Sequence, residues 1–320
     1  MDYRILGRTG VKVSALCLGG MYFGWRNDEA ESARIIHQAL DRGINFIDTA
    51  NVYAESRSET YVGKALRGRR DQVVLATKFR WGMGEGPNDE GASRLHLRAQ
   101  VENSLRRLQT DRIDLYQIHH PDPVTPLEET IEALTDLVRQ GKVLYIGTSN
   151  FPAWQLVEAQ WIADRRNLIR FVSEQPHYSA LDRTLEREII PACRKYGIGV
   201  ICWCPLDGGM LTGKYRKGQP PPPDSRAIEE KWALESPESM RCLDAVERLA
   251  ALAEARGKTL SQFSLAWLLA NPAVTAPIIG PRTPEQLDDN LGAVGWTLAP
   301  EELAAIDTIV PPGSAVSAAG

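Results

Sequence analysis

Residues 113–148 read IDLYQIHHPDPVTPLEETIEALTDLVRQGKVLYIGT, and this stretch decides the fold. It begins with a predominantly apolar run from Ile113 to His119 and ends with another from Val143 to Thr148. Neither run alternates regularly between apolar and polar residues, which is typical of parallel strands covered on both faces. Between them, Leu127 to Gln140 has the spacing of an amphipathic helix, and Gly141 suits its end. The stretch therefore predicts one strand–helix–strand unit of a parallel sheet.

The same unit recurs along the chain at intervals of about 30 residues. The other runs that we predict as strands are Leu16 to Gly19, Ile44 to Asp48, Val73 to Lys78, Phe171 to Gln175, Ile198 to Cys204 and Ala276 to Gly280. The other helix candidates are Asp28 to Arg42, Arg94 to Leu108, Ala153 to Ala163, Leu181 to Tyr196 and Pro284 to Gly292. Eight predicted strands alternating with helices favour an α/β fold of the (β/α)8 TIM-barrel type over a doubly wound open sheet.

Two segments lie outside this repeat. Tyr3 to Leu6 and Val11 to Val13 flank Gly7 to Gly10, which predicts an N-terminal β-hairpin that caps the floor of the barrel. Leu206 to Pro237 is the longest irregular segment, and its run of four prolines resists helix formation, so we expect a stiff surface loop and a candidate mobile cover. No linker interrupts the pattern, so residues 1–320 are expected to form a single domain.

Composition narrows the class of function. The chain has 37 Lys and Arg against 41 Asp and Glu, and a net charge of -4 gives no broad attraction for nucleic acid or anionic lipid. No apolar run approaches the roughly 20 residues that a membrane helix needs, and the N-terminus lacks a signal-peptide core, so we expect a cytoplasmic protein. The five Cys are scattered and fit reduced thiols better than a disulfide framework.

Four polar residue types follow neighbouring predicted strands. Asp48 ends the second strand with Tyr53 shortly after it, Lys78 ends the third, and His119 ends the fourth. Catalytic groups of such barrels come from the carboxyl ends of the strands, so we expect these side chains to meet at one rim. The Asp48 carboxylate can pair with the Lys78 ammonium group. A Lys78 ammonium group next to Tyr53 favours the phenolate and so lowers the pKa of Tyr53. His119 can orient a carbonyl oxygen while Tyr53 delivers a proton, which suits carbonyl reduction with hydride from a cofactor.

Three alternatives stay open on the residues alone. His120 competes with His119, and the sequence does not separate the two by chemistry. A metal site from His119, His120 and His177 has suitable ligands, but neighbouring strand residues point to opposite faces, so no metal is expected. Lys78 can also serve as the nucleophile of a Schiff-base aldolase on the same barrel. Taken singly, each rim residue has a purely structural explanation as well.

Two motif-like segments bear on the cofactor. Gly208 to Tyr215 has the spacing of a phosphate-binding P-loop, but Tyr215 stands where a Ser or Thr would bind magnesium. We therefore expect a loop of exposed amides and one lysine, Lys214, that contacts a pyrophosphate without metal. Gly147 to Phe151 is similar to a nucleophile elbow but has Phe151 in place of the second glycine, which disfavours a hydrolase.

Side chains at the ends of the later strands suit the two ends of a dinucleotide. Ser149, Asn150 and Gln175 offer paired donors and acceptors for an amide such as a carboxamide. Trp203 can stack on a flat ring, although a buried core tryptophan is an equal competitor. Arg282 stands at the mouth of a proline-started helix, where an arginine favours a 2′-phosphate and hence NADPH over NADH. No glycine-rich fingerprint follows a strand, so the dinucleotide would lie extended across the barrel top.

A specific combination of motifs is spread over nearly the whole chain. It consists of LGRTGVKVS (6–14), NFIDTA (45–50), IDLYQIH (113–119), GTSNF (147–151), LTGKY (211–215) and TPEQLDDN (283–290). With these motifs the chain closely resembles the aldo-keto reductase superfamily. The resemblance implies a catalytic tetrad of Asp48, Tyr53, Lys78 and His119, which selects the first of the two histidines. The family's A-Y-S-P-L pattern is here CWCPL (202–206), with tryptophan in place of tyrosine, which is more similar to the bacterial and potassium-channel-subunit branches.

The resemblance also implies which residues bind cofactor and substrate. The cofactor, NADPH in preference to NADH, would contact Gly20, Met21, Asp48, Ser149, Asn150, Gln175, Trp203, Pro205, Leu206, Gly208, Leu211, Gly213, Lys214, Gly280, Arg282, Gln286, Asp289 and Asn290. The substrate pocket would contain Tyr22, Trp25, Trp81 and His120, in the loops 22–25, 81–91 and 206–237 and beside them. The implied activity is reduction of a small-molecule aldehyde or ketone, with keto-sugars among the candidates. The alternative is a nucleotide-binding redox sensor with slow turnover; the residues do not fix an oligomeric state.

Overall fold

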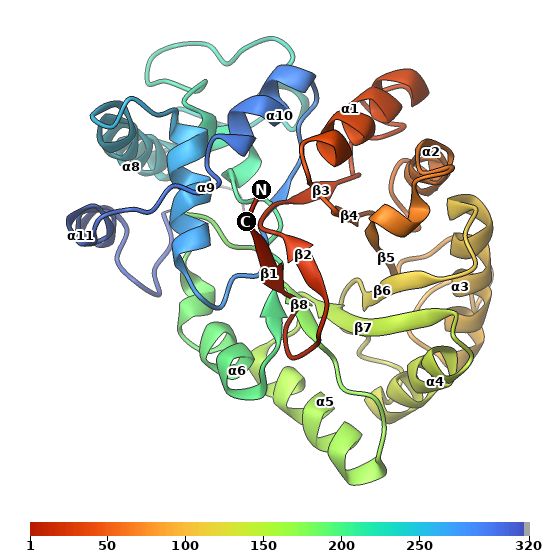
Figure 1. Ribbon diagram of the computed structural model, residues 1–320. Coiled ribbons are helices and arrows are strands. Elements are labelled where there is room, and N and C mark those ends of the chain that lie inside the picture. Colours follow the sequence, from red (N-terminus) through yellow and green to blue (C-terminus); the bar gives the residue numbers. More distant parts are fainter. Residues whose placement is uncertain (317–320) are drawn as a thin grey trace.

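The strands form a parallel sheet that curls into a barrel (Figure 1). The computed structural model describes residues 1–316, so residues 317–320 of the expected domain lie outside the described part. The eight strands follow one another round the sheet as β10 (Ile278–Ile279), β3 (Cys17–Gly19), β4 (Phe46–Asp48), β5 (Val74–Phe79), β6 (Ile113–Ile118), β7 (Val143–Ser149), β8 (Ser173–Gln175) and β9 (Gly199–Val200). The two ends of this order meet, because the Ile278 amide donates to the Cys202 carbonyl at 2.8 Å and Val200 pairs with Val274. The predicted (β/α)8 barrel is therefore confirmed.

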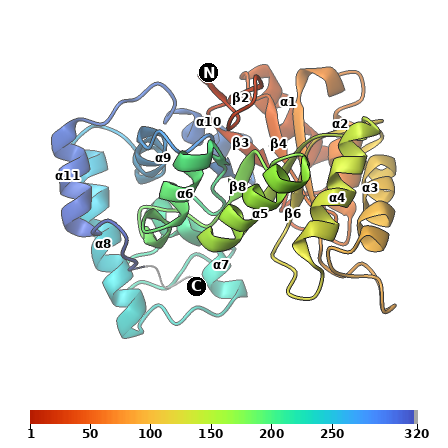
Figure 2. The same cartoon turned by 90° about the horizontal axis from the view of Figure 1, so that it is seen from below.

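Helices cover the outer face of the barrel. They are α1 (Glu29–Asp41), α2 (Arg57–Ala65), α3 (Arg94–Leu108), α4 (Leu127–Arg139), α5 (Ala153–Arg166), α6 (Ile189–Tyr196), α7 (Arg226–Glu229), α8 (Pro237–Glu254), α9 (Leu260–Ala270), α10 (Pro284–Leu291) and α11 (Pro300–Ile309). Local chemistry sets their ends: Asp28 and Glu31 form a capping box at the start of α1, and Gly141, at φ 74°, follows α4 as predicted. Figure 2 shows α8 and α11 side by side at one edge. None of the helices in this part of the chain is long and apolar enough to cross a membrane.

Some predicted boundaries differ from the structure. The helix predicted from Leu181 to Tyr196 is wrong in its first half, where only a 3-10 turn precedes α6. The reason is that Arg183 bonds to Asp307 at 2.7 Å and to the Val310 carbonyl at 2.7 Å, which ties this segment to α11 instead of to a helix of its own. The segment predicted as irregular, Leu206 to Pro237, contains a 3-10 stretch and α7. Helices α2, α8, α9 and α11 were not predicted.

The predicted N-terminal hairpin closes one end of the barrel. β1 (Tyr3–Ile5) pairs antiparallel with β2 (Lys12–Ser14), and Figure 1 shows the pair across the middle of the barrel. Leu6 and Val13 are fully buried in one apolar cluster with inward-facing residues of the strands. Those strand residues are Cys17, Phe46, Ala76, Leu115, Val172, Ile201 and Ala276. Figure 2 shows α7 at the opposite end of the barrel from the hairpin. The hairpin end is the floor of the barrel, and the end near α7 is its mouth.

Candidate active site

A polar layer lies directly above the apolar floor cluster. Side chains alternate along a strand, so the residues two positions beyond Phe46, Ala76 and Leu115 face the same interior. These residues are Asp48, Lys78 and Gln117, and their exposed fractions are 3%, 0% and 0%. Lys78 and Gln117 are register partners in neighbouring strands. A buried charge is costly unless it is paired, so the contacts of this layer decide its chemistry.

Lys78 is the centre of this layer. Its ammonium group donates to the Asp48 carboxylate, to the Thr49 carbonyl oxygen at 3.0 Å and to the Tyr53 hydroxyl at 3.2 Å. The three donors of the ammonium group are thus all used. The structure therefore brings Asp48, Lys78 and Tyr53 together in the way the sequence predicts.

Gln117 is a member of the layer that sequence reasoning missed. The Asp48 Oδ2 atom accepts hydrogen bonds from the side-chain amides of Gln117 and Gln175, both at 2.9 Å. The Gln175 amide also donates to the Gln117 oxygen at 3.2 Å. The available signal was the position of Gln117, an uncharged polar residue two places after Leu115 in a largely apolar strand.

The turn that carries Tyr53 is conformationally unusual. Ala54, Glu55 and Ser56 follow it with φ values of 50°, 55° and 73°, in the left-handed region that side chains other than glycine rarely adopt. The Ser56 hydroxyl donates to the Asn51 carbonyl at 2.8 Å and holds the turn closed before α2 begins. The left-handed turn reverses the chain and leaves the Tyr53 ring facing Lys78.

Burial, and not only Lys78, decides the protonation of Tyr53. Burial raises the pKa of Tyr53 above its ordinary value, and the opposing effect of the Lys78 ammonium does not cancel it. The predicted net lowering of this pKa is therefore wrong, although Lys78 does act in that direction. Burial alone would lower the pKa of Lys78, but Asp48 and Tyr53 outweigh it and raise that pKa. Tyr53 thus stays a neutral phenol and Lys78 stays an ammonium ion near neutral pH, which disfavours Lys78 as a Schiff-base nucleophile.

The structure separates the two adjacent histidines. The His119 ring lies edge-on to the Tyr53 ring with centroids 5.6 Å apart, whereas His120 is exposed. Burial, with the positive charge of Lys78 as a smaller cause, lowers the pKa of His119 to about 2. His119 is therefore a neutral imidazole, and its Nδ1 atom is buried without a hydrogen-bond partner among the described residues. A neutral imidazole can donate a hydrogen bond to a carbonyl oxygen.

The aromatic residues predicted for the substrate pocket fall into two groups. Trp81 lies beside the histidines, with ring centroids 6.2 Å from His119 and 5.5 Å from His120. The rings of Tyr22 and Trp25 pack against each other with centroids 5.8 Å apart, in the loop that follows β3. Trp81 is 38% exposed and Trp25 is 55% exposed, so both offer ring surface to a ligand.

The polar residues expected to hold a carboxamide are neighbours and are bonded to one another. Ser149 Oγ donates to the Gln175 carbonyl at 2.8 Å, and Asn150 Nδ2 donates to Ser149 Oγ at 3.0 Å. Asn150 Oδ1 accepts from Trp203 Nε1 at 3.0 Å. Gln175 Nε2 donates a hydrogen bond to Asp48. The Oε1 atom of Gln175 is left as an acceptor for a ligand amide.

Four cations gather at another part of the mouth. Partial loss of hydration, then the positive charges of Arg282 and Arg26, lowers the pKa of Lys214, although the residue as a whole is exposed. Burial and Arg282 likewise lower the pKa of Arg26, with a smaller effect from Arg226. Arg26 pairs with Glu229 of α7, and Arg282 donates to the Asp224 carbonyl at 3.0 Å. Like charges this close destabilise one another, so a multiply charged anion would be stabilised here.

The remaining residues predicted for the cofactor have mixed surroundings. Gly20 and Met21 follow β3, and the Gly20 amide donates to the Asp48 carbonyl at 2.8 Å. Gly280 is close to the Tyr22 ring. The others are distributed as follows: Pro205, Leu211 and Asn290 are buried, Gln286 and Lys214 are exposed, and Leu206, Gly208, Gly213 and Asp289 are half-buried. Asp289 Oδ1 accepts from Thr259, the N-cap residue of α9, and from Gln262 in α9, so that oxygen links α10 to α9.

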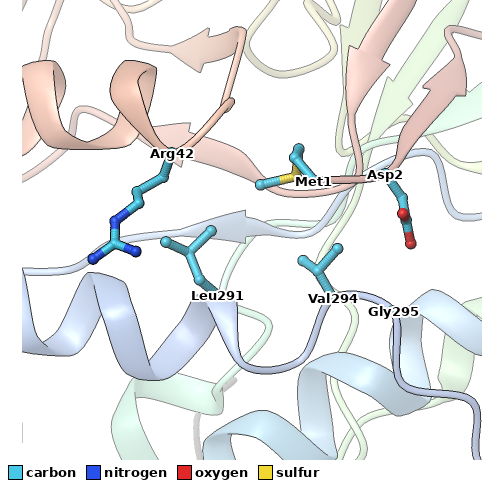
Figure 3. Close-up of a pocket in the computed structure, with 6 residues that line it drawn as sticks. All are labelled: Met1, Asp2, Arg42, Leu291, Val294 and Gly295. Atoms are coloured by element: carbon cyan, nitrogen blue, oxygen red, sulfur yellow. The ribbon is translucent and has the colours of Figure 1, made fainter.

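A pocket at the other end of the molecule has different chemistry. It lies beside the N-terminus and the ends of α1 and α10, near the floor hairpin (Figure 3). Its lining is Met1, Asp2, Arg42, Leu291, Val294 and Gly295. Its charged side chains are Asp2 and Arg42, and Arg42 pairs with Asp288 at 3.0 Å. Within residues 1–316, no three His, Cys, Asp or Glu side chains converge as ligands for a metal ion.

Comparison with known proteins extends over the whole fold. The model of the "Aldo/keto reductase family" matches residues 15–311. A Bacillus subtilis (strain 168) protein named "Uncharacterized oxidoreductase YrpG" is 45% identical over 97% of this chain and 96% of its own length. A Schizosaccharomyces pombe protein named "Putative voltage-gated potassium channel subunit beta" is 40% identical over 97% of this chain and 93% of its own length. The matched range, residues 15–311, spans all eight strands of the barrel, from β3 to β10.

Proposed function

Because this chain belongs to the aldo/keto reductase family, we propose that it reduces aldehyde or ketone carbonyls to alcohols with NADPH, and that Tyr53 donates the proton. The observation that carries the proposal is the hydrogen-bonded set of Asp48, Lys78 and Tyr53 beside the neutral ring of His119. Similarity to an oxidoreductase of Bacillus subtilis supports the reaction class.

Each residue of the set has one task in this proposal. Tyr53 is a neutral phenol and can release its proton to the carbonyl oxygen as negative charge develops there. Lys78 lies 3.2 Å from the phenol oxygen and stabilises the phenolate that results. Asp48 keeps Lys78 charged and in place, and Gln117 and Gln175 keep Asp48 in place. His119 holds the carbonyl oxygen by hydrogen bonding without competing for the proton.

The residues of the mouth fit a nicotinamide dinucleotide. The reduced nicotinamide, when bound, supplies hydride to the carbonyl carbon. Trp203 is 37% exposed and offers a flat apolar surface for that ring, and Gln175 and Asn150 lie beside it. The cluster of Arg26, Lys214, Arg226 and Arg282 fits the phosphates, and a cluster of this size favours the additional 2′-phosphate of NADPH.

The exposed rings suit a range of carbonyl substrates. Trp81 and His120 border the tetrad, so a substrate whose carbonyl reaches Tyr53 would contact these rings. Aromatic faces stack on flat or ring-shaped substrates, which keeps keto-sugars among the candidates. A panel of aldehydes, ketones and keto-sugars, followed by the loss of reduced-nicotinamide absorbance, measures this preference.

A Tyr53→Phe variant tests the proton donor. We expect carbonyl reduction to fall by about 10²- to 10⁴-fold, because the general acid is lost. The dissociation constant of NADPH should stay within about twofold of the wild type, since Lys78 keeps Asp48 and the Thr49 carbonyl as partners. Tyr196→Phe, at the end of α6, is the control. Turnover retained in Tyr53→Phe would remove Tyr53 from this role.

An Arg282→Ala variant tests the cofactor preference. We expect NADPH affinity to fall by about tenfold or more and NADH affinity to change little, because only NADPH carries the 2′-phosphate. Arg165→Ala, on the exposed side of α5, is the matched control. Equal weakening of both cofactors would contradict the 2′-phosphate assignment.

The similarity to potassium channel β subunits supports a second candidate function. Relatives named as potassium channel β subunits are about as long as this chain and 40% identical to it. We therefore retain a nucleotide-binding regulatory protein with slow turnover as the alternative. Tight NADPH binding without reduction of any carbonyl in the panel would support it.

A further inference from the structure

A histidine and two carboxylates lie behind Trp203, outside the catalytic set. His177 follows β8 and pairs with Trp203 in a parallel bridge. Its Nδ1 atom lies 3.3 Å from the Asp182 carboxylate, and its Nε2 atom lies 3.4 Å from the carboxylate of Asp207, which is fully buried. The proposed reaction assigns no task to these three side chains.

The surroundings of His177 require a charged ring. Both ring nitrogens face carboxylates, and only an imidazolium ion has a donor on each nitrogen. Burial alone would lower the pKa of His177, but the hydrogen bonds to Asp182 and Asp207 outweigh it and raise that pKa to about 11. The His177 side chain is 16% exposed, so water screens its charge only in part. His177 is therefore a fixed cation at neutral pH.

This cation lies flat against the indole ring of Trp203. The ring centroids of His177 and Trp203 are 4.6 Å apart and the planes are inclined by 27°. Trp203 Nε1 donates to Asn150, which fixes the rotation of the indole. Trp203 nevertheless stays 37% exposed, so indole surface that His177 does not cover can receive a second flat ring. A ring stacked there would be separated from the His177 charge only by the Trp203 indole ring.

We propose that the positive charge of His177 weakens the binding of the cationic oxidised nicotinamide relative to the neutral reduced nicotinamide. This inference rests on the proposed function, because it requires a nicotinamide on Trp203. The oxidised ring carries a positive charge that the reduced ring lacks, so repulsion from His177 acts on the oxidised form alone. The carboxylates of Asp182 and Asp207 attract the oxidised ring, so the repulsion from His177 is the one contribution that a change at residue 177 alone removes. Weaker binding of the oxidised cofactor favours its release after each turnover.

Binding measurements on two variants test the charge of residue 177. Isothermal titration calorimetry gives the dissociation constants of NADP⁺ and NADPH without turnover. A unit charge about 8 Å away, screened by an effective dielectric constant of about 40 to 80, changes the ratio of the two constants by about two- to sixfold. We expect His177→Gln to strengthen NADP⁺ relative to NADPH by this factor. His177→Arg keeps a flat cation that stacks on aromatic rings, so it should keep the wild-type ratio.

The outcomes separate the charge from the shape of residue 177. His37→Gln is the control, because the His37 ring bonds to the Ala65 carbonyl between α1 and α2, away from the mouth. An unchanged ratio in His177→Gln overturns the inference, and so does an equal shift in the Gln and Arg variants, which would indicate a packing role. Histidine NMR of the wild type reads the charge without cofactor: a neutral His177 at pH 7 overturns the inference. Wild-type protein that binds neither NADP⁺ nor NADPH overturns the proposed function itself.

Discussion

The Asp48–Lys78 pair should behave as a fully buried ion pair in stability measurements. Lys78 is 0% exposed and Asp48 is 3% exposed, so neither charge can regain water when its partner is removed. Removing one member of such a pair costs about 3 to 5 kcal/mol, because the other charge stays buried without compensation. We therefore expect Lys78→Met and Asp48→Asn each to lower the free energy of unfolding by about that amount.

The double variant Asp48→Asn with Lys78→Met contains neither charge. Its free energy of unfolding should exceed the additive expectation by about 2 kcal/mol or more, since no uncompensated charge remains. An asparagine at position 48 can still accept from Gln117 and Gln175, and the methionine fills most of the lysine stem. Urea denaturation at pH 7, with the slope of each transition checked for constancy, measures all four proteins.

The exposed pair Glu29–Lys64 provides the control. Its side chains are 48% and 39% exposed, and Lys64→Met should cost less than about 1 kcal/mol. A loss below about 1 kcal/mol in Lys78→Met, or strict additivity in the cycle, would refute the reasoning. Such a result would mean that water or a rearranged neighbour compensates the remaining charge.

Three further outcomes are expected. Burial raises the pKa of Glu174 to about 8, so the folded protein keeps a proton that the unfolded chain loses near pH 4 to 5. The free energy of unfolding should therefore fall as the pH rises toward 8. Denaturation at pH 5 and pH 8 measures this fall, and Glu174→Gln should remove it. The NMR signal of His119, assigned as the one missing in His119→Asn, should not titrate between pH 5 and pH 9, and a midpoint near 6.5 would contradict its burial. Gly63→Ala should lower the melting temperature, since a Cβ there would lie 2.6 Å from backbone atoms of α3, whereas Gly10→Ala, with nothing within 4 Å, should not.

Most of the fold could be predicted because local and global signals agree in the long βα units. Residues 113–148 contain an apolar strand, an amphipathic helix with a glycine end and a second strand, and the structure has each of them within two residues. The prediction was wrong at Leu181 to Tyr196, where the bonds of Arg183 to the distant Asp307 and Val310 override helical spacing. Such contacts between distant segments leave no trace in local periodicity.

The site residues could be predicted where their position at the end of a strand determines where they lie. Asp48 and Lys78 end their strands, so the barrel alone places them together. Gln117 was missed because it lies inside a strand that we interpreted as apolar on both faces. The sign of the Tyr53 pKa shift was wrong because a sequence shows the neighbouring charge but not the degree of burial. The separation of His119 from His120 likewise needed the fold, because both follow the same strand.

The floor hairpin is synthesised long before the carbonyl groups that hold it in place. Arg4 donates to the carbonyl oxygens of Leu269 and Val274, which lie 265 and 270 residues later in the chain. At a synthesis rate of about 5 to 20 residues per second, the N-terminal strands wait on the order of tens of seconds for these acceptors. During that interval Leu6 and Val13 have no completed barrel in which to be buried. Closure of the barrel floor therefore joins segments that are made about 265 residues apart.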